Sequence, residues 1–423
     1  MAALSIIQPA KFWLEKIHLF PKSVILTLMS LWVFYLSIIL TPTTETFRFA
    51  TFNTALSRNE AGGLITELST PNHQQAKNVA EIIQRVNPDV LVLQEFDYDE
   101  GGKALQLFQD NYLRIGQHGA QPIDFKYTYA VPSNTGIPSG MDLDKDGKID
   151  GPGDALGFGV HPGQYAFAIL SKYPLMNTSP NTPRCQGGVK DNIRTFQQFL
   201  WKDMSGAKLP KTPATGETWY SAEALDIFRL SSKNHVDVPI ELPTGIIHLL
   251  VAHPTPPVFD GDEDRNGLRN FDEIRLLADY ITPGKADYLY DDNGQKGGLD
   301  ATAHFVIMGD MNADPVEGDS RDNAIHQLLN HPRLHQHPAP TSPGSKENAQ
   351  LNPDTYNKGN PAHQTASWGL RVDYVLPSRD LKVYASGVFW PNSSNPLYYL
   401  VEKQGETEAS SDHHLVWADI ALP

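Results

Sequence analysis

Cysteine and basic residues are the scarce components of this 423-residue chain. Cys185 is its only cysteine, so no disulfide can form within the chain. Lys and Arg together number 34 against 49 Asp and Glu, which leaves a net charge of −15 at pH 7. Such a surface repels polyanions and argues against nonspecific nucleic-acid binding through a basic patch. A small phosphorylated substrate stays compatible with this charge, because a bound cation reverses the local field.

The chain also lacks an internal repeat and any stretch with the composition of a flexible interdomain linker. Its 40% hydrophobic and 20% charged residues are ordinary for a globular protein. We therefore expect one large domain over residues 43–423. Three polar stretches, at 131–163, 205–222 and 335–364, predict surface insertions or long loops.

One long apolar run lies near the start of the chain, at residues 23–40, and three lysines precede it. Such a run, if helical, rises about 27 Å, close to the thickness of a bilayer core. Residues 1–42 therefore predict a basic cytoplasmic segment followed by a membrane signal anchor. A cleaved signal peptide and a buried core helix stay open as alternatives, although no A-x-A cleavage pattern follows the run. Both the anchor and the signal peptide predict an exported domain that faces the periplasm or the exterior.

Apolar patterning predicts strands and helices that alternate along the rest of the chain. Residues 90–93 are all apolar, as a strand buried on both faces requires. Residues 73–86 carry apolar side chains at helical spacing. Further strands are expected at 47–52, 166–170, 194–201, 246–252, 305–308, 372–376 and 415–420, and further helices at 270–281 and 323–329. This alternation predicts packed sheets with helices outside them.

Short acidic and amide motifs follow most of these predicted strands. Carboxylate and amide oxygens at strand ends are the groups that a hard cation and a phosphate require. These motifs lie far apart in the sequence, so they make chemical sense only if folding brings them together. They are Thr51-Phe52-Asn53, Gln94-Glu95, Ala252-His253-Pro254, Gly309-Asp310-Met311-Asn312-Ala313-Asp314-Pro315, Arg371-Val372-Asp373-Tyr374 and Ser411-Asp412-His413.

As an ordered set, these motifs resemble those of the endonuclease/exonuclease/phosphatase superfamily, and the resemblance spans roughly residues 47–420. It implies the deoxyribonuclease I-like α/β fold, a four-layer sandwich of two packed mixed β-sheets flanked by helices, here with long loop insertions. It also implies a metal-dependent phosphoric ester hydrolase with Mg²⁺ or Mn²⁺ at its active site.

Glu95 and Asn53 each end a predicted strand. Glu95 is expected to bind the Mg²⁺ or Mn²⁺, since one carboxylate leaves the rest of the ion's shell to water and phosphate oxygen. Asn53 supplies an amide that can bond a metal-bound water or a phosphate oxygen without adding charge. A salt-bridged surface glutamate and a turn-capping asparagine are the structural alternatives.

The strongest single motif contains Asp310 and Asn312. Their spacing of two places both side chains on the same side of an extended strand. The resemblance implies that Asp310 polarises or deprotonates the attacking water, and that Asn312 orients this water or holds the phosphate. The structural alternative is a turn that merely ends a core strand.

Histidines supply the remaining catalytic groups that the resemblance implies. His253 can donate to a phosphate oxygen and stabilise the charged transition state. His413 is expected beside the scissile phosphate as acid, base or electrostatic clamp, with Asp373 fixing its tautomer and Asp412 near the metal. The adjacent His414 is expected to point away, since neighbouring side chains on a strand face opposite sides.

A basic stretch between Glu95 and His253 offers further positive charge. Arg229, Lys233 and His235 are candidates to contact a phosphate, and a solvated strand is the structural alternative. The chain is longer in this region than compact members of the superfamily, so the resemblance assigns no role here.

Two loops have the ligand spacing of an EF-hand calcium loop. Each is expected to bind a structural Ca²⁺ through carboxylate or amide oxygens, and an ordinary polar turn is the alternative. The first loop would use Asp142, Asp144, Asp146 and Asp150, and the second would use Asp262, Asp264, Asn266 and Glu273.

The whole sequence predicts an exported, divalent-metal-dependent phosphoester hydrolase, either a phosphodiesterase or a phosphatase, that acts on a phosphate ester through water activated by Asp310. An extracellular nonspecific nuclease is the alternative enzyme, although the acidic surface disfavours nucleic acid. A catalytically inactive binding module tethered to the membrane is the alternative of a different class. The intact motifs favour an enzyme.

Overall fold

The computed structural model describes residues 44–176, 193–353, 355, 358–404 and 407–423. The predicted apolar span at 23–40 lies outside the described residues, as does Cys185. Within the part that the structure describes, no helix combines the length and the hydrophobicity needed to cross a bilayer. Residues Thr46–Pro423 belong to one unit, which is described below.

A six-stranded sheet is built around β1 (Phe47–Leu56). This strand pairs in parallel with β2 (Val90–Phe96) and antiparallel with β13 (Val416–Ala421), the last strand of the chain. All other neighbours in the sheet are antiparallel. The spatial order is β10 (Lys382–Val388), β13, β1, β2, β4 (Phe167–Ser171) and β3 (Tyr127–Val131).

A five-stranded sheet forms from the middle of the chain and one later strand. Its order is β5 (Arg194–Thr195), β6 (His235–Leu242), β7 (Gly245–Ala252), β8 (Phe305–Asp310) and β9 (Asp373–Pro377). Only β7 and β8 are parallel. A separate small hairpin joins β11 (Lys403–Gln404) and β12 (Thr407–Glu408).

Each of the two larger sheets therefore contains a single parallel pair, β1–β2 in one and β7–β8 in the other. The carboxyl ends of two parallel strands lie at the same edge of a sheet. The residues that follow these four strands consequently gather at one edge of each sheet. Contacts of β1 with β8 and β9 bring these two edges together.

The two sheets pack face to face through apolar side chains. Val92, Leu249, Val306 and Met308 are fully buried and belong to one continuous cluster between the sheets. Burial of each such side chain contributes about 1.5–3 kcal/mol. The near-continuous apolar composition of β2, β7 and β8 follows from this position, because helices cover the outer faces of the sheets.

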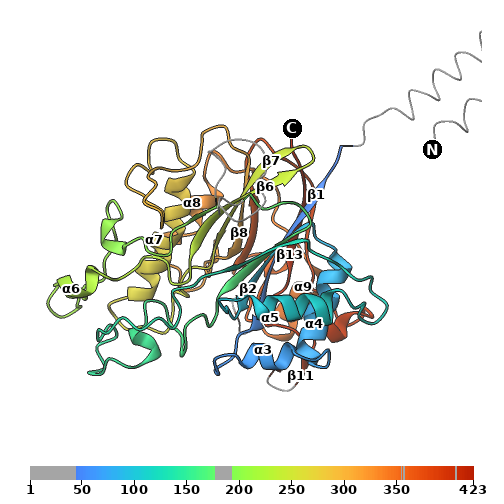
Figure 1. Ribbon diagram of the computed structural model, residues 1–423, viewed down its shortest axis with the longest axis horizontal. Coiled ribbons are helices and arrows are strands. Elements are labelled where there is room, and N and C mark those ends of the chain that lie inside the picture. Colours follow the sequence, from blue (N-terminus) through green and yellow to red (C-terminus); the bar gives the residue numbers. More distant parts are fainter. Residues whose placement is uncertain (1–43, 177–192, 354, 356–357, 405–406) are drawn as a thin grey trace, which may run out of the picture. The chain divides into compact units, whose positions relative to one another are not determined.

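Helices complete the four layers. Figure 1 shows α3, α4 and α5 together beside β2, and α7 and α8 beside β8. The predicted sandwich of two mixed sheets flanked by helices is therefore confirmed. The α-helices are α3 (Gly63–Leu68), α4 (Gln74–Val86), α5 (Lys103–Phe108), α6 (Ala222–Leu225), α7 (Arg265–Tyr280), α8 (His326–Leu329) and α9 (Pro343–Leu351). The shorter helical turns are the π-helical η2 (Gln109–Leu113) and the 3₁₀ turns η3 (Pro152–Asp154), η4 (Trp201–Asp203), η5 (Arg321–Asn323), η6 (Pro361–His363) and η7 (Tyr398–Leu400).

The helix predicted at 73–86 forms as α4, and its ends have local causes. The His73 side chain accepts a hydrogen bond from the Ala76 amide at the first turn. Asn87 ends the helix in the left-handed conformation, with φ of 52°, which asparagine tolerates better than most residues. The stripe that includes Ala76, Val79 and Ile83 is buried against the sheet cluster.

The strand predicted at 194–201 is mostly wrong. Only Arg194 and Thr195 pair with β6. The carboxylate of Asp292 accepts the backbone amides of Gln197 and Gln198 at 3.1 and 2.7 Å. These bonds interrupt the ladder, and the chain resumes backbone pairing only at an isolated bridge of Leu200 with Arg229, directly before η4.

The long loop predicted at 335–364 is also wrong in part, because it contains α9 and η6. Ser342 caps α9 by accepting the amide of Ser345, and Pro343 occupies the first turn. The helix buries only Gly344 and Ser345. Hydrophobic periodicity therefore gave no signal for it.

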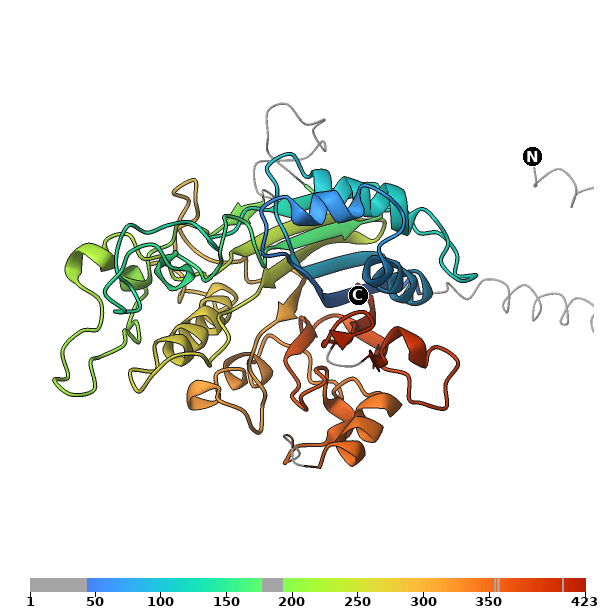
Figure 2. The ribbon, with the colours of Figure 1, turned by 90° about the horizontal axis from the view of Figure 1, so that it is seen from below.

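The polar stretches predicted as insertions are largely irregular. Residues 131–163 contain only the end of β3 and η3, and residues 205–222 run into α6. Figure 2 shows these green loops at one end of the molecule, apart from the orange and red segments that follow residue 330.

Candidate active site

Asn53 and Glu95 meet at the shared edge of β1 and β2. Asn53 lies opposite Gln94 in the parallel register, and Glu95 adopts a left-handed φ of 52°. The Asn53 amide nitrogen is 3.2 Å from Glu95 Oε1 and 3.1 Å from Asp310 Oδ2. One buried amide thus links the six-stranded sheet to the end of β8.

Asp310 ends β8, and the glycine before it permits a close approach of β7. Gly309 has φ of 150°, and a Cβ there would meet the Ala252 carbonyl oxygen at 2.0 Å. Asp310 Oδ1 accepts the Asn312 amide at 2.9 Å. Asn312 has φ of 49° and donates its side-chain amide to the Pro254 carbonyl at 3.1 Å. The extended backbone expected across Asp310 and Asn312 is therefore wrong, because the chain turns at Asn312.

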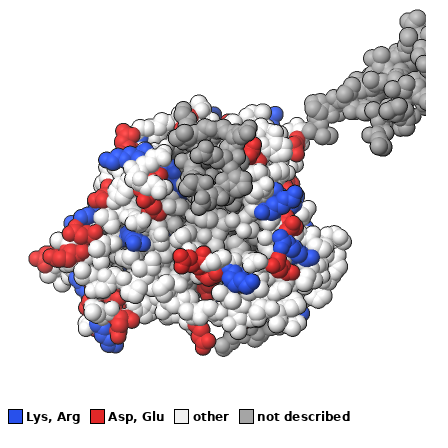
Figure 3. Space-filling model, viewed as in Figure 1, with Lys and Arg blue, Asp and Glu red and all other residues white. Residues whose placement is uncertain are grey.

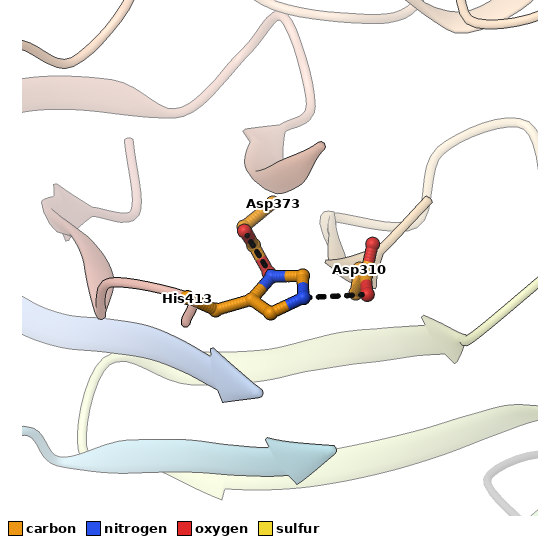
Figure 4. A group of neighbouring side chains, drawn as sticks. All are labelled: Asp310, Asp373 and His413. Atoms are coloured by element: carbon orange, nitrogen blue, oxygen red, sulfur yellow. Dashed lines mark hydrogen bonds and ion pairs between the residues drawn. The ribbon is translucent and has the colours of Figure 1, made fainter. Parts of the chain in front are cut away.

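His413 and Asp373 form a buried pair (Figure 4). His413 Nδ1 lies 2.9 Å from Asp373 Oδ2, and the same oxygen accepts the Thr365 hydroxyl at 2.7 Å. The partner of His413 on its other side is Asp310, whose Oδ2 lies 3.7 Å from Nε2. Trp368 packs edge-on against the ring, with 4.9 Å between centroids. The imidazole is therefore held between two carboxylates.

His253 follows β7 and approaches Asp310 from the neighbouring parallel strand, at the same edge of the five-stranded sheet. Its Nε2 is 3.4 Å from Asp310 Oδ2, and its Nδ1 is buried without a hydrogen-bond partner. Burial and the nearby Lys233 lower the pKa of His253 to about 4, so the ring is neutral at pH 7. A neutral ring carries a single N–H, which faces the Asp310 carboxylate when it is on Nε2 and leaves Nδ1 as an acceptor.

A single oxygen atom is the centre of this arrangement. Asp310 Oδ2 lies within 3.1–3.7 Å of Asn53 Nδ2, His253 Nε2 and His413 Nε2. Burial alone would raise the pKa of Asp310, but His413 and His253 outweigh it and lower that pKa below its usual range. Burial likewise would lower the pKa of His413, yet Asp373 and Asp310 raise it well above its usual range. The opposite directions of these two pKa shifts follow from the attraction between the Asp310 carboxylate and the His413 ring.

Lys233 is the basic residue of the 229–235 stretch that faces the site. Its side chain is 7% exposed, and no hydrogen bond or ion pair with it occurs among the described residues. Burial lowers the pKa of Lys233, while Glu273, Glu95 and Asp310 oppose this change. Arg229 instead donates to Asn134 Oδ1, and His235 bonds Ser231 and the Glu273 carbonyl. The structure therefore separates Lys233 from the other two candidates.

The residues expected to hold a divalent cation fit that role in type and placement. Glu95 is partly exposed, and its Oε1 accepts a hydrogen bond from the Asn53 side-chain amide. Burial raises the pKa of Glu95, His413 opposes this, and the nearby Asp412 raises it further. Two neighbouring carboxylates beside an open position suit a hard cation. Asp310, Asp373 and His413 also lie within 4.8 Å of one another, but the bond of His413 to Asp373 already occupies that group.

The two calcium-like loops differ in the structure. Carboxylate oxygens of Asp142, Asp144 and Asp146 lie within 4.8 Å of one another. Asp150, expected as a fourth ligand, is exposed and outside this group.

The second calcium loop does not form, because α7 begins at Arg265 and includes Asn266 and Glu273, two of the four expected ligands. Asp264 pairs with Arg321, and Asp262 is exposed. Asn266 donates to the Val258 carbonyl. Glu273 is buried in α7, where both of its carboxylate oxygens accept backbone amides. The expectation of a calcium site from these four residues is wrong.

His414 points away from the site, as expected. Its ring stacks on Trp390 with 3.6 Å between centroids. The reason differs from the one expected, since both histidines precede β13 rather than lying on it. Sequence reasoning also missed Thr365. A hydroxyl eight residues before Asp373 carries no periodic signal that would reveal its bond to that carboxylate.

A model of the Endonuclease/Exonuclease/phosphatase family matches residues 50–413. Three solved structures are similar to this chain at low identity. An endonuclease/exonuclease/phosphatase from Beutenbergia cavernae has 15% identity and a TM-score of 0.47, over 89% of this chain and 72% of the other. Sphingomyelinase C from Streptomyces griseocarneus has 17% identity and a TM-score of 0.43, over 89% and 99%. Beta toxin from Staphylococcus aureus with bound magnesium ions has 15% identity and a TM-score of 0.41, over 90% and 100%. No curated protein matches the chain.

Proposed function

Because the chain belongs to the endonuclease/exonuclease/phosphatase family, we propose that it is a divalent-metal-dependent phosphoester hydrolase. The observation that carries this proposal is the convergence of Asn53, His253 and His413 on one oxygen of Asp310. An ionised carboxylate held by three donors can accept a proton from water beside a phosphate. No packing role requires this set of polar groups in a buried place.

In the proposed reaction, Asp310 Oδ2 accepts a proton from the attacking water. The oxygen of that water bonds to phosphorus as the bond to the leaving oxygen breaks, and the leaving oxygen takes up a proton from solvent to become the alcohol. Buried Lys233 donates to the phosphate oxygens, as does the single N–H of neutral His253 if it turns from Asp310 to the phosphate, and His413, whose pKa its carboxylate partners raise, stabilises the added charge. Asn53 orients Asp310, while Asn312 fixes the turn beside it. A cation held by Glu95 and Asp412 would supply Lewis-acid stabilisation of the phosphate when bound.

A panel of esters tests the proposal and its alternatives. Bis-p-nitrophenyl phosphate, p-nitrophenyl phosphate, plasmid DNA and a phospholipid head-group ester would each be tried with Mg²⁺, Mn²⁺ or Ca²⁺. We expect metal-dependent turnover of at least one ester by the wild type and turnover by Asp310→Asn that is lower by about 10²–10⁴. Turnover of DNA alone would favour the nuclease. A folded wild type that binds phosphate but turns over no ester would favour the inactive binding module.

We also propose export of the catalytic unit, with residues 1–42 as membrane anchor or signal peptide. The apolar run at 23–40 and the lysines before it support this. Protease treatment of intact cells that express a C-terminally tagged full chain tests it. Digestion of the tag at the outer face of the inner membrane is expected, and full protection until lysis would contradict export.

A structural Ca²⁺ at Asp142, Asp144 and Asp146 is the second metal that we propose. The closeness of their carboxylates and the EF-hand spacing support it. The oxygens would repel one another without a cation, so binding would stabilise the insertion that contains them.

A further inference from the structure

Three segments that carry or adjoin proposed catalytic residues are hydrogen-bonded to side chains on one face of α7. The segments are the turn before Lys233, the turn after His253 and the loop from Asp310 to Asn312. Each is bonded to a side chain of α7 that is completely buried, either Asn270 or Glu273. These two side chains lie three residues apart, so they share a face of the helix.

Glu273 holds the first two segments. Its Oε1 accepts the backbone amide of Ser232 at 2.7 Å, directly before Lys233. Its Oε2 accepts the amide of Thr255 at 2.6 Å, two residues after His253. No side-chain cation forms an ion pair with this carboxylate among the described residues. Its charge nevertheless opposes the lowering of the pKa values of Lys233 and Arg269 by burial, so the carboxylate balances two buried cations beside the site.

Asn270 is hydrogen-bonded to the third segment as well as to the second. Its side-chain amide donates to the Thr255 carbonyl at 2.8 Å and to the Met311 carbonyl at 3.0 Å. Met311 lies between Asp310 and Asn312. One residue, Thr255, is therefore bonded on its amide by Glu273 and on its carbonyl by Asn270.

We propose that Glu273 is a positioning residue of the active site, which holds Lys233 and His253 against the substrate phosphate through the amides of Ser232 and Thr255. Asn270 connects the Thr255 segment to the Asp310 turn through its bonds to the carbonyls of Thr255 and Met311. This inference rests on the proposed hydrolase function, because it assigns a role in that reaction. A carboxylate suits the role, since it accepts on both oxygens, whereas a glutamine would turn a donor toward one of the two amides.

Glu273→Gln in the full chain tests the proposal, with Asp272→Asn as the matched control. Asp272 is also a buried α7 carboxylate, but it bonds Trp201 Nε1 and the Lys208 amide, away from the catalytic segments. Turnover of bis-p-nitrophenyl phosphate, inhibition by inorganic phosphate and the Mg²⁺ concentration for half-maximal activity would be measured for each.

We expect Glu273→Gln to lower kcat/KM about a hundredfold per folded molecule, as misplacement of catalytic groups by roughly 1 Å can do. The inhibition constant of phosphate should rise, while the Mg²⁺ requirement should not change, because Glu95 lies on another segment. Asp272→Asn should lower the melting temperature and leave kcat/KM unchanged. Equal kcat/KM for Glu273→Gln and wild type would overturn the positioning role.

Two further outcomes separate this inference from the proposed function. If Glu273→Gln does not fold, Asn270→Ala is tested instead and should also lower kcat/KM. An unchanged kcat/KM for Asn270→Ala would overturn the proposal that α7 side chains position the catalytic segments. If the wild type hydrolyses no ester, the proposed function fails, and phosphate binding by wild type and Glu273→Gln decides the positioning role. A wild type that neither hydrolyses esters nor binds phosphate overturns both.

Discussion

The chemistry of this site is concentrated at Asp310, and its removal gives the first prediction. Asp310→Asn keeps the side-chain volume but abolishes the negative charge that can accept a proton. We expect turnover to fall by about 10²–10⁴, with the folded structure retained because the side chain faces other polar groups rather than the apolar core. Kinetics and circular dichroism on the same preparation measure this. A variant that lost helicity along with activity would mark Asp310 as structural.

The adjacent histidines should separate activity from stability. His413 bonds Asp373 in the site, so His413→Ala should cost about 10²–10⁴ in turnover. His414 is buried and stacked on Trp390. His414→Ala should therefore lower stability by roughly 1–3 kcal/mol and leave turnover close to wild type. Urea unfolding and steady-state kinetics measure the two effects, and the reverse ranking would contradict the assignment.

At the residue scale, the sequence was sufficient where a functional group lies near or just after the carboxyl end of a strand. Asn53, Glu95, His253 and Asp310 could be predicted as neighbours because strand ends in parallel pairs share an edge. The role of Glu273 was not predictable, because its ligand-like spacing matched a calcium loop. Only the early start of α7 shows that its carboxylate faces inward. Among the described residues, no hydrogen bond or ion pair involves the Lys233 side chain. This too could not be predicted, because it depends on how distant segments pack.

At the scale of elements, periodicity predicted those that bury a full stripe or face. β2, β7, β8 and α4 were all expected within a few residues of their observed bounds. The length of β5 was overestimated, because Asp292 accepts the backbone amides of Gln197 and Gln198 that a longer strand would use. Helix α9 was missed because it has no apolar stripe. Side-chain capping decides such elements, and capping partners far away in the sequence leave no local pattern.

A buried carboxylate in the middle of α4 gives a pH prediction. Glu81 accepts from Tyr399, His118 and Arg85 at 2.5–2.8 Å, which joins α4 to two other segments. Burial would raise the pKa of Glu81, but these three partners outweigh it and lower that pKa below 4.5. The stabilisation is then present above pH 4.5 and is lost as the pH falls through the folded value.

Glu81→Gln should accordingly be less stable than wild type at pH 7 by roughly 1.5–3 kcal/mol, the range for hydrogen bonds to charged groups. The gap should narrow as the pH falls through this lowered pKa, because the wild-type carboxylate is then protonated too. Chemical unfolding at a series of pH values measures this difference. A gap that stays constant with pH would show that the charge of Glu81 contributes nothing.

The loop at Asp142 gives a metal-dependent prediction. Addition of Ca²⁺ after chelation should raise the melting temperature, and Mg²⁺ should do so poorly, because it resists a flexible oxygen cage. Asp144→Ala should remove this response, whereas Asp264→Ala should leave it intact because Asp264 pairs with Arg321 instead. A response lost in Asp264→Ala but not in Asp144→Ala would place the ion elsewhere.

For the whole molecule, charge sets the expected partners. Figure 3 shows Lys and Arg side chains on this face scattered or beside acidic ones rather than gathered into a patch. With a net charge of −15, we expect duplex DNA to bind more weakly than about 10⁻⁴ M at physiological salt. Fluorescence anisotropy with a labelled duplex measures this. Micromolar binding that weakens steeply with salt would contradict the expectation and favour the nuclease.

The place of β13 in the six-stranded sheet has a consequence for biosynthesis. This strand is the last in the chain, yet it lies between β10 and β1, well inside the sheet. His413 directly precedes it, and its contact with Asn53 joins residues 360 positions apart. β1 therefore gains its second neighbour, and the imidazole reaches Asp310, only after residues 413–421 have left the ribosome. We expect a nascent chain to lack the proposed activity until this late segment has folded onto β1.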